Sequence, residues 1–230
     1  MNTIKYLVVS TRRWNHKAFK ECSPYLPGEW HLWTEPEELT LPNLQALQPT
    51  KVFFPHWNWV VPNEILQCFT CICFHMTALP YGRGGSPLQN LILKGHQDTQ
   101  LTALKMTPEL DAGPTYAQET LSLAGSAQDI FERAAPLVYK LIEKILTEDV
   151  QPVAQKGEVV YFKRRNPEQS ELPSGLSKLA TYDFIRMLDA EGYPKAFVRC
   201  QERRIELSQA KINSSGVLTA QAHFIEEGNE

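Results

Sequence analysis

The chain has 230 residues, of which 43% are hydrophobic and 21% are charged, and these values fit one large globular domain or one domain with a small appendage. Its formal net charge is −3, so the basic surplus of a broad nucleic-acid-binding surface is missing and we expect no nucleic-acid partner. No apolar run approaches the roughly 20 residues of a membrane span, so we expect no membrane partner either.

The N-terminal sequence and the cysteines favour a cytoplasmic location. The segment MNTIKYLVVS lacks the basic start, long apolar core and cleavage site of a signal peptide. Five cysteines are an odd number, and Cys68, Cys71 and Cys73 lie close together in the sequence. This pattern indicates reduced thiols rather than a disulfide framework.

Apolar runs alternate with short helical patterns over the first half of the chain. A continuous apolar run such as IKYLVVS is typical of a strand buried on both faces of a parallel sheet. Strands are predicted at residues 4–10, 28–34, 51–56, 70–75, 102–107 and 114–123, and helices just after residue 15 and at 41–50, 62–69 and 87–95. This alternation predicts an α/β fold with a largely parallel sheet.

A long amphipathic helix is predicted to follow. Ser126 is a good N-cap, and Asp129 three residues later completes a variant of the capping box. The apolar side chains then recur at helical spacing on one face, at Ile130, Ala134, Leu137, Leu141 and Ile145. We interpret it as a helix that covers the sheet.

The segment VQPVAQKGE at 150–158 marks a predicted domain boundary. We expect a catalytic domain at 1–150 and a substrate-binding subdomain of α+β or β-rich character at 151–230. In the second part a helix is predicted around 181–190, with strands near 196–200, 204–208 and 217–225. Its length is near the lower limit for an independent core, so we expect it to depend on the first domain.

The stretch CICFHMTALPYGRGGSP at 71–87 carries the first candidate site. Alternation along a strand places Cys71, Cys73 and His75 on one face, with His75 at the carboxyl edge of the sheet, where open α/β folds bind ligands. Three glycines in the following loop allow a ligand to approach the backbone, and Arg83 could bind an anion. The alternative is a structural histidine followed by an ordinary connection.

A second candidate residue follows the next strand in MTPELDAG at 106–113. Asp111 could accept a hydrogen bond from His75 across the cleft and orient the imidazole ring for proton transfer. Two adjacent strand ends would then carry an acid–base pair. The alternative is an aspartate that only forms the turn before a glycine.

Together these segments resemble the N10-formyltetrahydrofolate-dependent formyltransferases, which include enzymes acting on methionyl-tRNA, on glycinamide ribonucleotide and on sugars. The matching residues, in order and spacing, are His75, Leu79-Pro80, Arg83-Gly84, Pro87, Thr102, Met106, Leu110-Asp111 and Gly113. The resemblance covers about residues 1–125. It implies a Rossmann-like sheet with helices on both faces, His75 as the catalytic histidine and Asp111 as its partner.

The resemblance also implies a cosubstrate, N10-formyltetrahydrofolate, and no metal. We expect this folate to bind along the strand exits, near residues 54–62 and the 80–87 loop. The residues assigned to it are Trp57, Pro80, Arg83, Gly84, Gly85 and Asp111.

One position departs from the family pattern. The family has an asparagine two residues before the histidine, and this chain has Cys73. A thiol is a weak hydrogen-bond donor, and losing a donor to the oxyanion can cost roughly a hundredfold in rate. Either the activity is lost or another group donates to the oxyanion. The segment FPHWNWVVP at 54–62 offers His56 and Asn58 at the preceding strand exit, and Asn58 is the expected substitute.

The cysteines permit a rival interpretation as a metal or redox site. Cys68-x-x-Cys71 has the required spacing, and Cys73-x-His75 could form a thiol–imidazole pair. A structural zinc site usually needs four ligands, and cysteines in a buried strand pack as small apolar side chains. We therefore expect no metal.

The tail is similar to the region that follows the catalytic domain in sugar N-formyltransferases. The similarity rests on YFKRRNPEQSEL and on YDFIRMLDAEGYPKAF. It implies Arg164 and Arg186 as ligands of a nucleotide diphosphate, with Phe184 and Tyr193 also contacting the substrate. The alternative is that Phe184 belongs to the core and that Lys163–Arg165 is a solvated charge run.

The expected reaction is formyl transfer to the amine of a UDP- or dTDP-linked aminosugar. The segments HWNW and RGGSPLQNLI most resemble the enzymes linked to pseudaminic-acid-type sugars, which favours a UDP-4-amino-4,6-dideoxy sugar as the substrate. His75 would be the general base, with Asp111, Cys73 and Asn58 completing the catalytic set. The alternatives are an enzyme like methionyl-tRNA formyltransferase and a non-catalytic protein that binds folate or a nucleotide sugar. The sequence does not decide the oligomeric state, and a homodimer is one of the alternatives.

Overall fold

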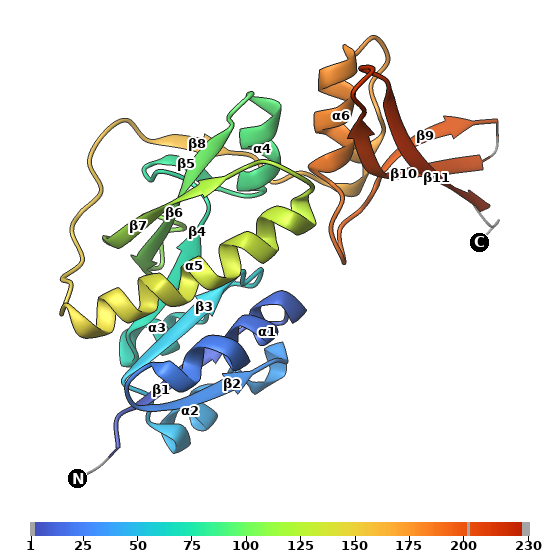
Figure 1. Cartoon of the computed structure of the whole chain (residues 1–230). Helices are drawn as coiled ribbons and strands as arrows, with labels where there is room; N and C mark the ends of the chain where they lie inside the picture. The colour runs from blue at the N-terminus through green and yellow to red at the C-terminus, as the bar shows by residue number, and fades with distance from the viewer. Residues whose placement is uncertain (1–2, 202, 227–230) are drawn as a thin grey trace. The chain divides into compact units, whose positions relative to one another are not determined.

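The computed structural model of the chain describes residues 3–201 and 203–226 (Figure 1). The α-helices are α1 (Arg13–Cys22), α2 (Leu41–Leu47), α3 (Asn63–Cys68), α4 (Pro87–Leu93), α5 (Ala127–Thr147) and α6 (Lys178–Arg186). The strands of the first half are β1 (Lys5–Val9), β2 (Glu29–Trp33), β3 (Lys51–Pro55), β4 (Cys71–His75), β5 (Tyr81–Gly84), β6 (Asp98–Lys105) and β7 (Thr115–Ser122). The later strands are β8 (Val160–Phe162), β9 (Ala196–Cys200), β10 (Arg203–Ile212) and β11 (Leu218–Glu226).

The chain divides into two compact units that are each built from several segments. The first unit contains residues 1–84, 99–121 and 132–161, and the second contains 85–98, 122–131 and 162–230. The division predicted from the sequence, at residue 150, stays a prediction for the functional domains.

A six-stranded sheet forms the centre of the first unit, in the order β2-β1-β3-β4-β6-β7. Strand β1 is parallel to both β2 and β3, and β3 is parallel to β4. Strand β6 is antiparallel to β4, and His75 pairs with Thr102 in that register. The predicted α/β fold with a mostly parallel sheet is confirmed.

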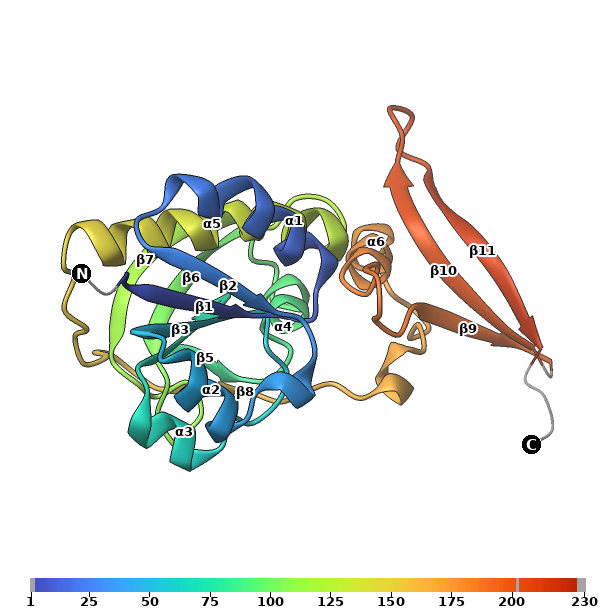
Figure 2. The same ribbon diagram turned by 90° about the horizontal axis from the view of Figure 1, so that it is seen from below.

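Helices cover both faces of this sheet, with α1 and α5 on one face and α2 and α3 on the other (Figure 2). Phe53 and Phe54 are adjacent in β3 and therefore point to opposite faces, and both are fully buried. Phe54 packs in a cluster with Leu44 of α2 and Ile65 of α3. Phe53 lies 5.8 Å from the ring of Trp30. A strand buried on both faces reads as a continuous apolar run, which is why the strand predictions were close.

The predicted start of α5 is confirmed in its hydrogen bonds. The Ser126 hydroxyl accepts from the backbone N–H of Asp129 at 3.2 Å, and Oδ2 of Asp129 accepts from the backbone N–H of Ser126 at 2.8 Å. These bonds use N–H groups that the helix itself leaves unpaired.

The second unit contains an antiparallel sheet in the order β11-β10-β9, together with α4 and α6. The predicted β-rich C-terminal region is confirmed, and β10 is longer than the predicted strand at 204–208. Strand β5, which pairs with β8, was not predicted, because its sequence YGRG carries no strand pattern. Within the described part of the chain, no helix is long and apolar enough to cross a membrane.

Candidate active site

His75 is the last residue of β4, and it is 8% exposed. Its Nε2 lies 2.8 Å from the carbonyl oxygen of Gly82. A carbonyl can only accept, so Nε2 carries a proton and donates it. The strand therefore fixes the position of the imidazole, and the loop after the strand fixes the orientation of its ring.

Asp111 faces the other nitrogen of this ring. Its Oδ1 lies 3.7 Å from Nδ1 of His75, and both side chains are about nine-tenths buried. This distance is too long for a direct hydrogen bond, and the pair becomes an ion pair only when the ring is protonated. Oδ2 of Asp111 accepts a hydrogen bond of 2.9 Å from the backbone N–H of Gly84. The two residues paired by the sequence analysis therefore lie face to face.

The loop that carries Asp111 depends on a glycine. A Cβ atom at Gly113 would lie 1.7 Å from the carbonyl oxygen of Lys105, the last residue of β6. Asp111 itself has a φ of +52°, a conformation that aspartate tolerates better than most residues. The glycine of the Leu-Asp-x-Gly pattern is thus required by a close turn after β6.

Gln155, which was not predicted from the sequence, connects the two loops of the site. Its Oε1 accepts hydrogen bonds from Nε and Nη2 of Arg83 at 3.1 and 2.9 Å. Its Nε2 donates to the carbonyl oxygens of Asp111 and Gly113, both at 2.8 Å. All four hydrogen-bonding positions of this amide are used. No motif or periodicity in the segment 150–158 identified it.

Arg83 was expected to bind an anion, but the structure places its guanidinium within the protein. The residue is 8% exposed, and besides Gln155 it contacts Oε1 of Glu109, at 3.4 Å from Nη1. Its charge therefore holds the loop in place. The neighbouring residues Gly84 and Gly85 make backbone hydrogen bonds. The N–H of Gly84 donates to Asp111, and the N–H of Gly85 donates to the carbonyl of Phe162 at 3.1 Å.

Cys73 lies two residues before His75 and packs against the apolar cluster beneath the sheet. Burial raises the pKa of its thiol far above the usual range, and the charge of Asp111 raises it further. Cys73 is therefore a neutral thiol near Asp111. Cys71 is also buried, and burial raises its pKa to about 12.

The loop after β3 presents aromatic side chains beside exposed polar ones. The ring of Trp57 lies 5.8 Å from that of Phe54 and 4.8 Å from that of Trp59. Its indole Nε1 is buried and has no hydrogen-bond partner among the described residues. Asn58, the expected replacement for the family's asparagine, is exposed to solvent.

His56 precedes this loop and is held neutral. Burial lowers its pKa to about 3, with a further contribution from the positive charge of Arg12. Its ring meets that of Trp14 edge-on, with the centroids 5.3 Å apart. His56 therefore supports the loop as a neutral aromatic ring.

Grouped metal ligands are absent from the described residues, where no three or more His, Cys, Asp or Glu side chains converge. Cys68 is exposed and Cys71 is buried, and both are free thiols. Their spacing in the sequence does not bring a ligand set together.

The residues assigned to a nucleotide sugar lie in the second unit and mostly serve its packing. Arg186 is 6% exposed and donates to Asp183 at 2.6 Å and to the carbonyls of Leu123 and Gly125 at 2.6 and 2.8 Å. Phe184 is buried beneath the guanidinium of Arg165. The ring of Tyr193 stacks on Phe131 with centroids 5.3 Å apart. Arg164 is exposed.

A solved methionyl-tRNA formyltransferase from Clostridium thermocellum matches the whole chain. The two are 38% identical, the match covers 97% of this chain and 99% of the other, and the TM-score is 0.93. The chain belongs to the methionyl-tRNA formyltransferase family. Residues 167–225 also match the family model described as the C-terminal domain of methionyl-tRNA formyltransferase.

Curated members of the family are longer than this chain. The methionyl-tRNA formyltransferase of Nitratiruptor is 34% identical over 116 residues, which cover 49% of this chain and 38% of that protein. The match to the methionyl-tRNA formyltransferase of Bacillus thuringiensis, at 31% identity, covers 63% of this chain and 49% of that protein. The chain thus spans about half the length, or less, of the curated relatives it matches.

Two more distant solved structures share the fold. A sugar N-formyltransferase from a Shewanella species is 14% identical with a TM-score of 0.65, and the match covers 95% of this chain and 96% of the other. HypX from Aquifex aeolicus, solved with tetrahydrofolic acid, is 19% identical with a TM-score of 0.75, over 93% of this chain and 38% of that protein. Members of the formyltransferase family use N10-formyltetrahydrofolate, in agreement with the expected cosubstrate.

The comparisons correct the expected substrate and partner. The prediction of a UDP- or dTDP-linked aminosugar is wrong, because the match at 38% identity over both full chains is to a methionyl-tRNA formyltransferase. The prediction of no nucleic-acid partner is wrong for the same reason, since such enzymes act on a tRNA. The sugar was favoured by the resemblance of the tail and of the segments HWNW and RGGSPLQNLI to sugar N-formyltransferases, and nucleic acid was excluded because of the net charge of −3.

Proposed function

We propose that the chain transfers a formyl group from N10-formyltetrahydrofolate to the amino group of methionyl-tRNA. The observation that carries the proposal is the full-length match at 38% identity to a solved methionyl-tRNA formyltransferase. The C-terminal family match and the His75–Asp111 geometry support it.

The reaction exchanges one C–N bond for another. The amino nitrogen attacks the formyl carbon, and the bond from that carbon to N10 of the folate then breaks. His75 takes a proton from the attacking amine, directly or through a water, and a proton is returned to N10. This assignment makes His75 a general acid–base residue.

The surroundings of His75 fit the charged form of its ring. After proton uptake both ring nitrogens carry hydrogens, and one faces the Gly82 carbonyl while the other faces the Asp111 carboxylate. The Gly84 N–H and the Gln155 amide hold Asp111 in that position. These acceptors are in place before the reaction and face the two N–H groups that the ring carries after it takes the proton.

The loop after β3 supplies a candidate contact for the folate. Trp57 combines a flat apolar ring with a buried N–H that has no acceptor among the described residues. A buried donor without a partner is costly, and a bound ligand with an acceptor would satisfy it. We assign Trp57 to cosubstrate binding, with Asn58 retained as a candidate donor to the oxyanion.

The test is to follow formation of tetrahydrofolate by the purified chain, given N10-formyltetrahydrofolate and an amine acceptor. We expect turnover with methionyl-tRNA and much slower turnover with free methionine, because binding of the tRNA positions the amine. Folate binding without turnover on any acceptor would instead identify a non-catalytic folate-binding protein, an alternative that the thiol at Cys73 favours.

A further inference from the structure

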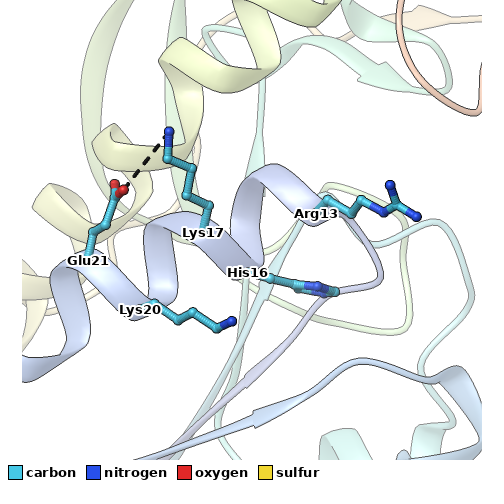
Figure 3. Close-up of a pocket in the computed structure, with 5 residues that line it drawn as sticks. All are labelled: Arg13, His16, Lys17, Lys20 and Glu21. Carbon is cyan, nitrogen blue, oxygen red and sulfur yellow. Dashed lines mark ion pairs between the residues drawn. The ribbon is translucent and has the colours of Figure 1, made fainter.

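A shallow hollow of about 400 Å³ lies beside α1 and is lined by Arg13, His16, Lys17, Lys20 and Glu21 (Figure 3). Lys17 and Glu21 form an ion pair at 4.0 Å, and Nε2 of His16 lies 2.5 Å from the carbonyl oxygen of Ser10. These side chains have partners within the protein, so the hollow itself points to no ligand. The contacts that bear on the reaction lie inside the sheet, around the loop that follows His75.

The turn after β4 is held by two threonines of β6. Oγ1 of Thr102 donates to the carbonyl oxygen of Thr77 at 2.6 Å, and Oγ1 of Thr99 donates to the carbonyl oxygen of Met76 at 3.2 Å. All three threonines are buried. Met76 and Thr77 directly follow His75, so β6 fixes the path on which the chain leaves β4.

The carbonyl of Thr77 is the base of the turn that returns to the imidazole ring. Besides the Thr102 hydroxyl, it accepts from the backbone N–H of Leu79 at 3.0 Å, which occupies both of its lone pairs. Further along the loop, the carbonyl of Gly82 accepts from Nε2 of His75 at 2.8 Å, and the Thr77 hydroxyl lies 3.5 Å from the same oxygen. The place of the acceptor for His75 therefore depends on how firmly Thr77 is held.

Gln118 of β7 sets the direction of the Thr102 hydroxyl. Its amide Nε2 lies 3.0 Å from Oγ1 of Thr102 and can only donate. The hydroxyl must then accept from Gln118 and use its one proton for the Thr77 carbonyl. Because Thr102 lies opposite His75 in the register of β4 and β6, the contacts from Gln118 to Thr77 run beside the ring.

We propose that Thr102 is a positioning residue for His75 and that Gln118 keeps its hydroxyl directed at the Thr77 carbonyl. The kinetic part of this inference rests on the proposed function. Without the Thr102 hydroxyl, Thr77 keeps only the N–H of Leu79, and the turn that presents the Gly82 carbonyl loosens. The ring of His75 then loses the acceptor that holds its proton on Nε2 and leaves Nδ1 free to take a proton on the side of Asp111.

A second glutamine–threonine pair across the same two strands provides a matched control. Nε2 of Gln100 in β6 donates to Oγ1 of Thr120 in β7 at 3.2 Å, which is the same contact with the strands exchanged. Within the described part of the chain, this pair holds no carbonyl of the loop after β4. Gln118 and Thr120 are both exposed, so substitutions in either pair can be made outside the core.

The first test is kinetic and compares Thr102→Val with Thr102→Ser, using methionyl-tRNA as the acceptor. We expect Thr102→Val to lower kcat about tenfold with little change in the KM for the folate, because displacement of the base slows the reaction without weakening binding. Thr102→Ser keeps the hydroxyl, so its kcat should stay within about twofold of the wild type.

The direction of the hydroxyl is tested by Gln118→Glu against Gln100→Glu. A carboxylate can only accept, so in Gln118→Glu it draws the Thr102 proton away from the Thr77 carbonyl, and kcat should fall as in Thr102→Val. Gln100→Glu adds the same charge across the same strands and should leave kcat unchanged. Equal losses in the two glutamate variants would attribute the effect to charge and overturn the role of Gln118.

A second readout does not depend on turnover. The ¹⁵N NMR spectrum of ring-labelled histidine reports which nitrogen of the neutral His75 ring carries the proton, and comparison with His75→Asn assigns the signals. We expect the Nε2–H form to dominate in the wild type and in Thr102→Ser. A mixture of the two neutral forms is expected in Thr102→Val and in Gln118→Glu.

The outcomes separate this inference from the proposed function. Wild-type kcat and a wild-type spectrum in Thr102→Val overturn the positioning role, and so does a loss in Thr102→Ser as large as that in the valine variant. A wild-type chain without turnover on methionyl-tRNA removes the proposed function, whereas the spectra still decide the role of Thr102. Thermal unfolding checks each variant, and if Thr102→Val does not fold, the exposed Gln118 variant decides the outcome.

Discussion

The side-chain oxygen of Gln155 accepts two hydrogen bonds from the guanidinium of Arg83, while the amide nitrogen of Gln155 donates to the loop of Asp111. One uncharged side chain thus fixes the distance between Arg83 and the Asp111 loop, on either side of His75. The residue is distant in sequence from both loops, and its effect is on position rather than on the reacting atoms.

Replacing Gln155 should therefore slow turnover more than it weakens substrate binding. We expect Gln155→Ala to lower kcat about tenfold, with little change in KM, because Asp111 loses a positioning contact. Gln155→Glu keeps the acceptor for Arg83 but places a carboxylate oxygen against the carbonyls of Asp111 and Gly113. If the glutamate variant is as active as the wild type, the contact to the Asp111 loop has no role in positioning.

Gly113 should be intolerant of any side chain. The added methyl group of Gly113→Ala would meet the Lys105 carbonyl oxygen at 1.7 Å, so the backbone of the Asp111 loop must shift. We expect a loss of about 2–4 kcal/mol in the free energy of unfolding and a loss of activity. Denaturant unfolding measures the former.

Gly175→Ala is the matched control for this prediction. Gly175 has a φ of +78° and no atom within 4 Å of an added Cβ, so the substitution costs about 1 kcal/mol from backbone strain alone. Similar losses at both glycines would contradict the steric account of Gly113.

The neutral His56 should make stability depend on pH in mildly acid solution. Its pKa is lowered to about 3 in the folded state, against about 6.5 when unfolded, so between these values the unfolded chain binds the extra proton. The stability it contributes is present above pH 6.5 and is lost as the pH falls toward 3, by at most about 1.4 kcal/mol per pH unit.

The measurement is denaturant unfolding of wild type and His56→Phe at pH 7.0 and at pH 4.5. The variant keeps an aromatic ring beside Trp14 and removes the titrating group. We expect its loss of stability on acidification to be smaller than that of the wild type. Parallel losses in the two proteins would show that other groups cause the acid sensitivity.

The thiol at Cys73 should limit the rate of formyl transfer. Cys73→Asn introduces an amide N–H two residues before His75, where the family has its asparagine, and a new oxyanion donor should raise kcat at least tenfold. Cys73→Ala serves as the control, since it removes the thiol without adding a donor. An unchanged kcat in the asparagine variant would mean that another group, such as Asn58 or Trp57, already stabilises the oxyanion.

The pairing of His75 with Asp111 was expected from adjacent strand ends, but β6 is antiparallel to β4, so its last residue, Lys105, pairs with Ile72, and it is the loop after β6 that brings Asp111 to the ring. The sheet itself was predictable because apolar runs mark buried strands. Phe53 and Phe54 illustrate this, since consecutive buried side chains need cover on both faces. The helix cap at Ser126 and Asp129 was predictable for the same reason.

The remaining parts of the site depend on contacts distant in sequence. Gln155 contacts Arg83 across 72 positions, and no local pattern records such a pair. Arg186 donates to the carbonyls of Leu123 and Gly125, more than 60 positions away, and these contacts are equally invisible in the sequence. The net charge of −3 gave the wrong expectation about nucleic acid, because it describes the whole chain and not any one surface.

The most direct measurement is the single-turnover rate of formyl transfer to methionyl-tRNA by His75→Asn and Asp111→Asn, with folate binding followed by fluorescence. We expect His75→Asn to lower the rate by about a thousandfold or more and Asp111→Asn by about tenfold to a hundredfold, while both variants bind folate within severalfold of wild type. A His75→Asn chain that transfers the formyl group at the wild-type rate would contradict the assignment of this imidazole as the acid–base group.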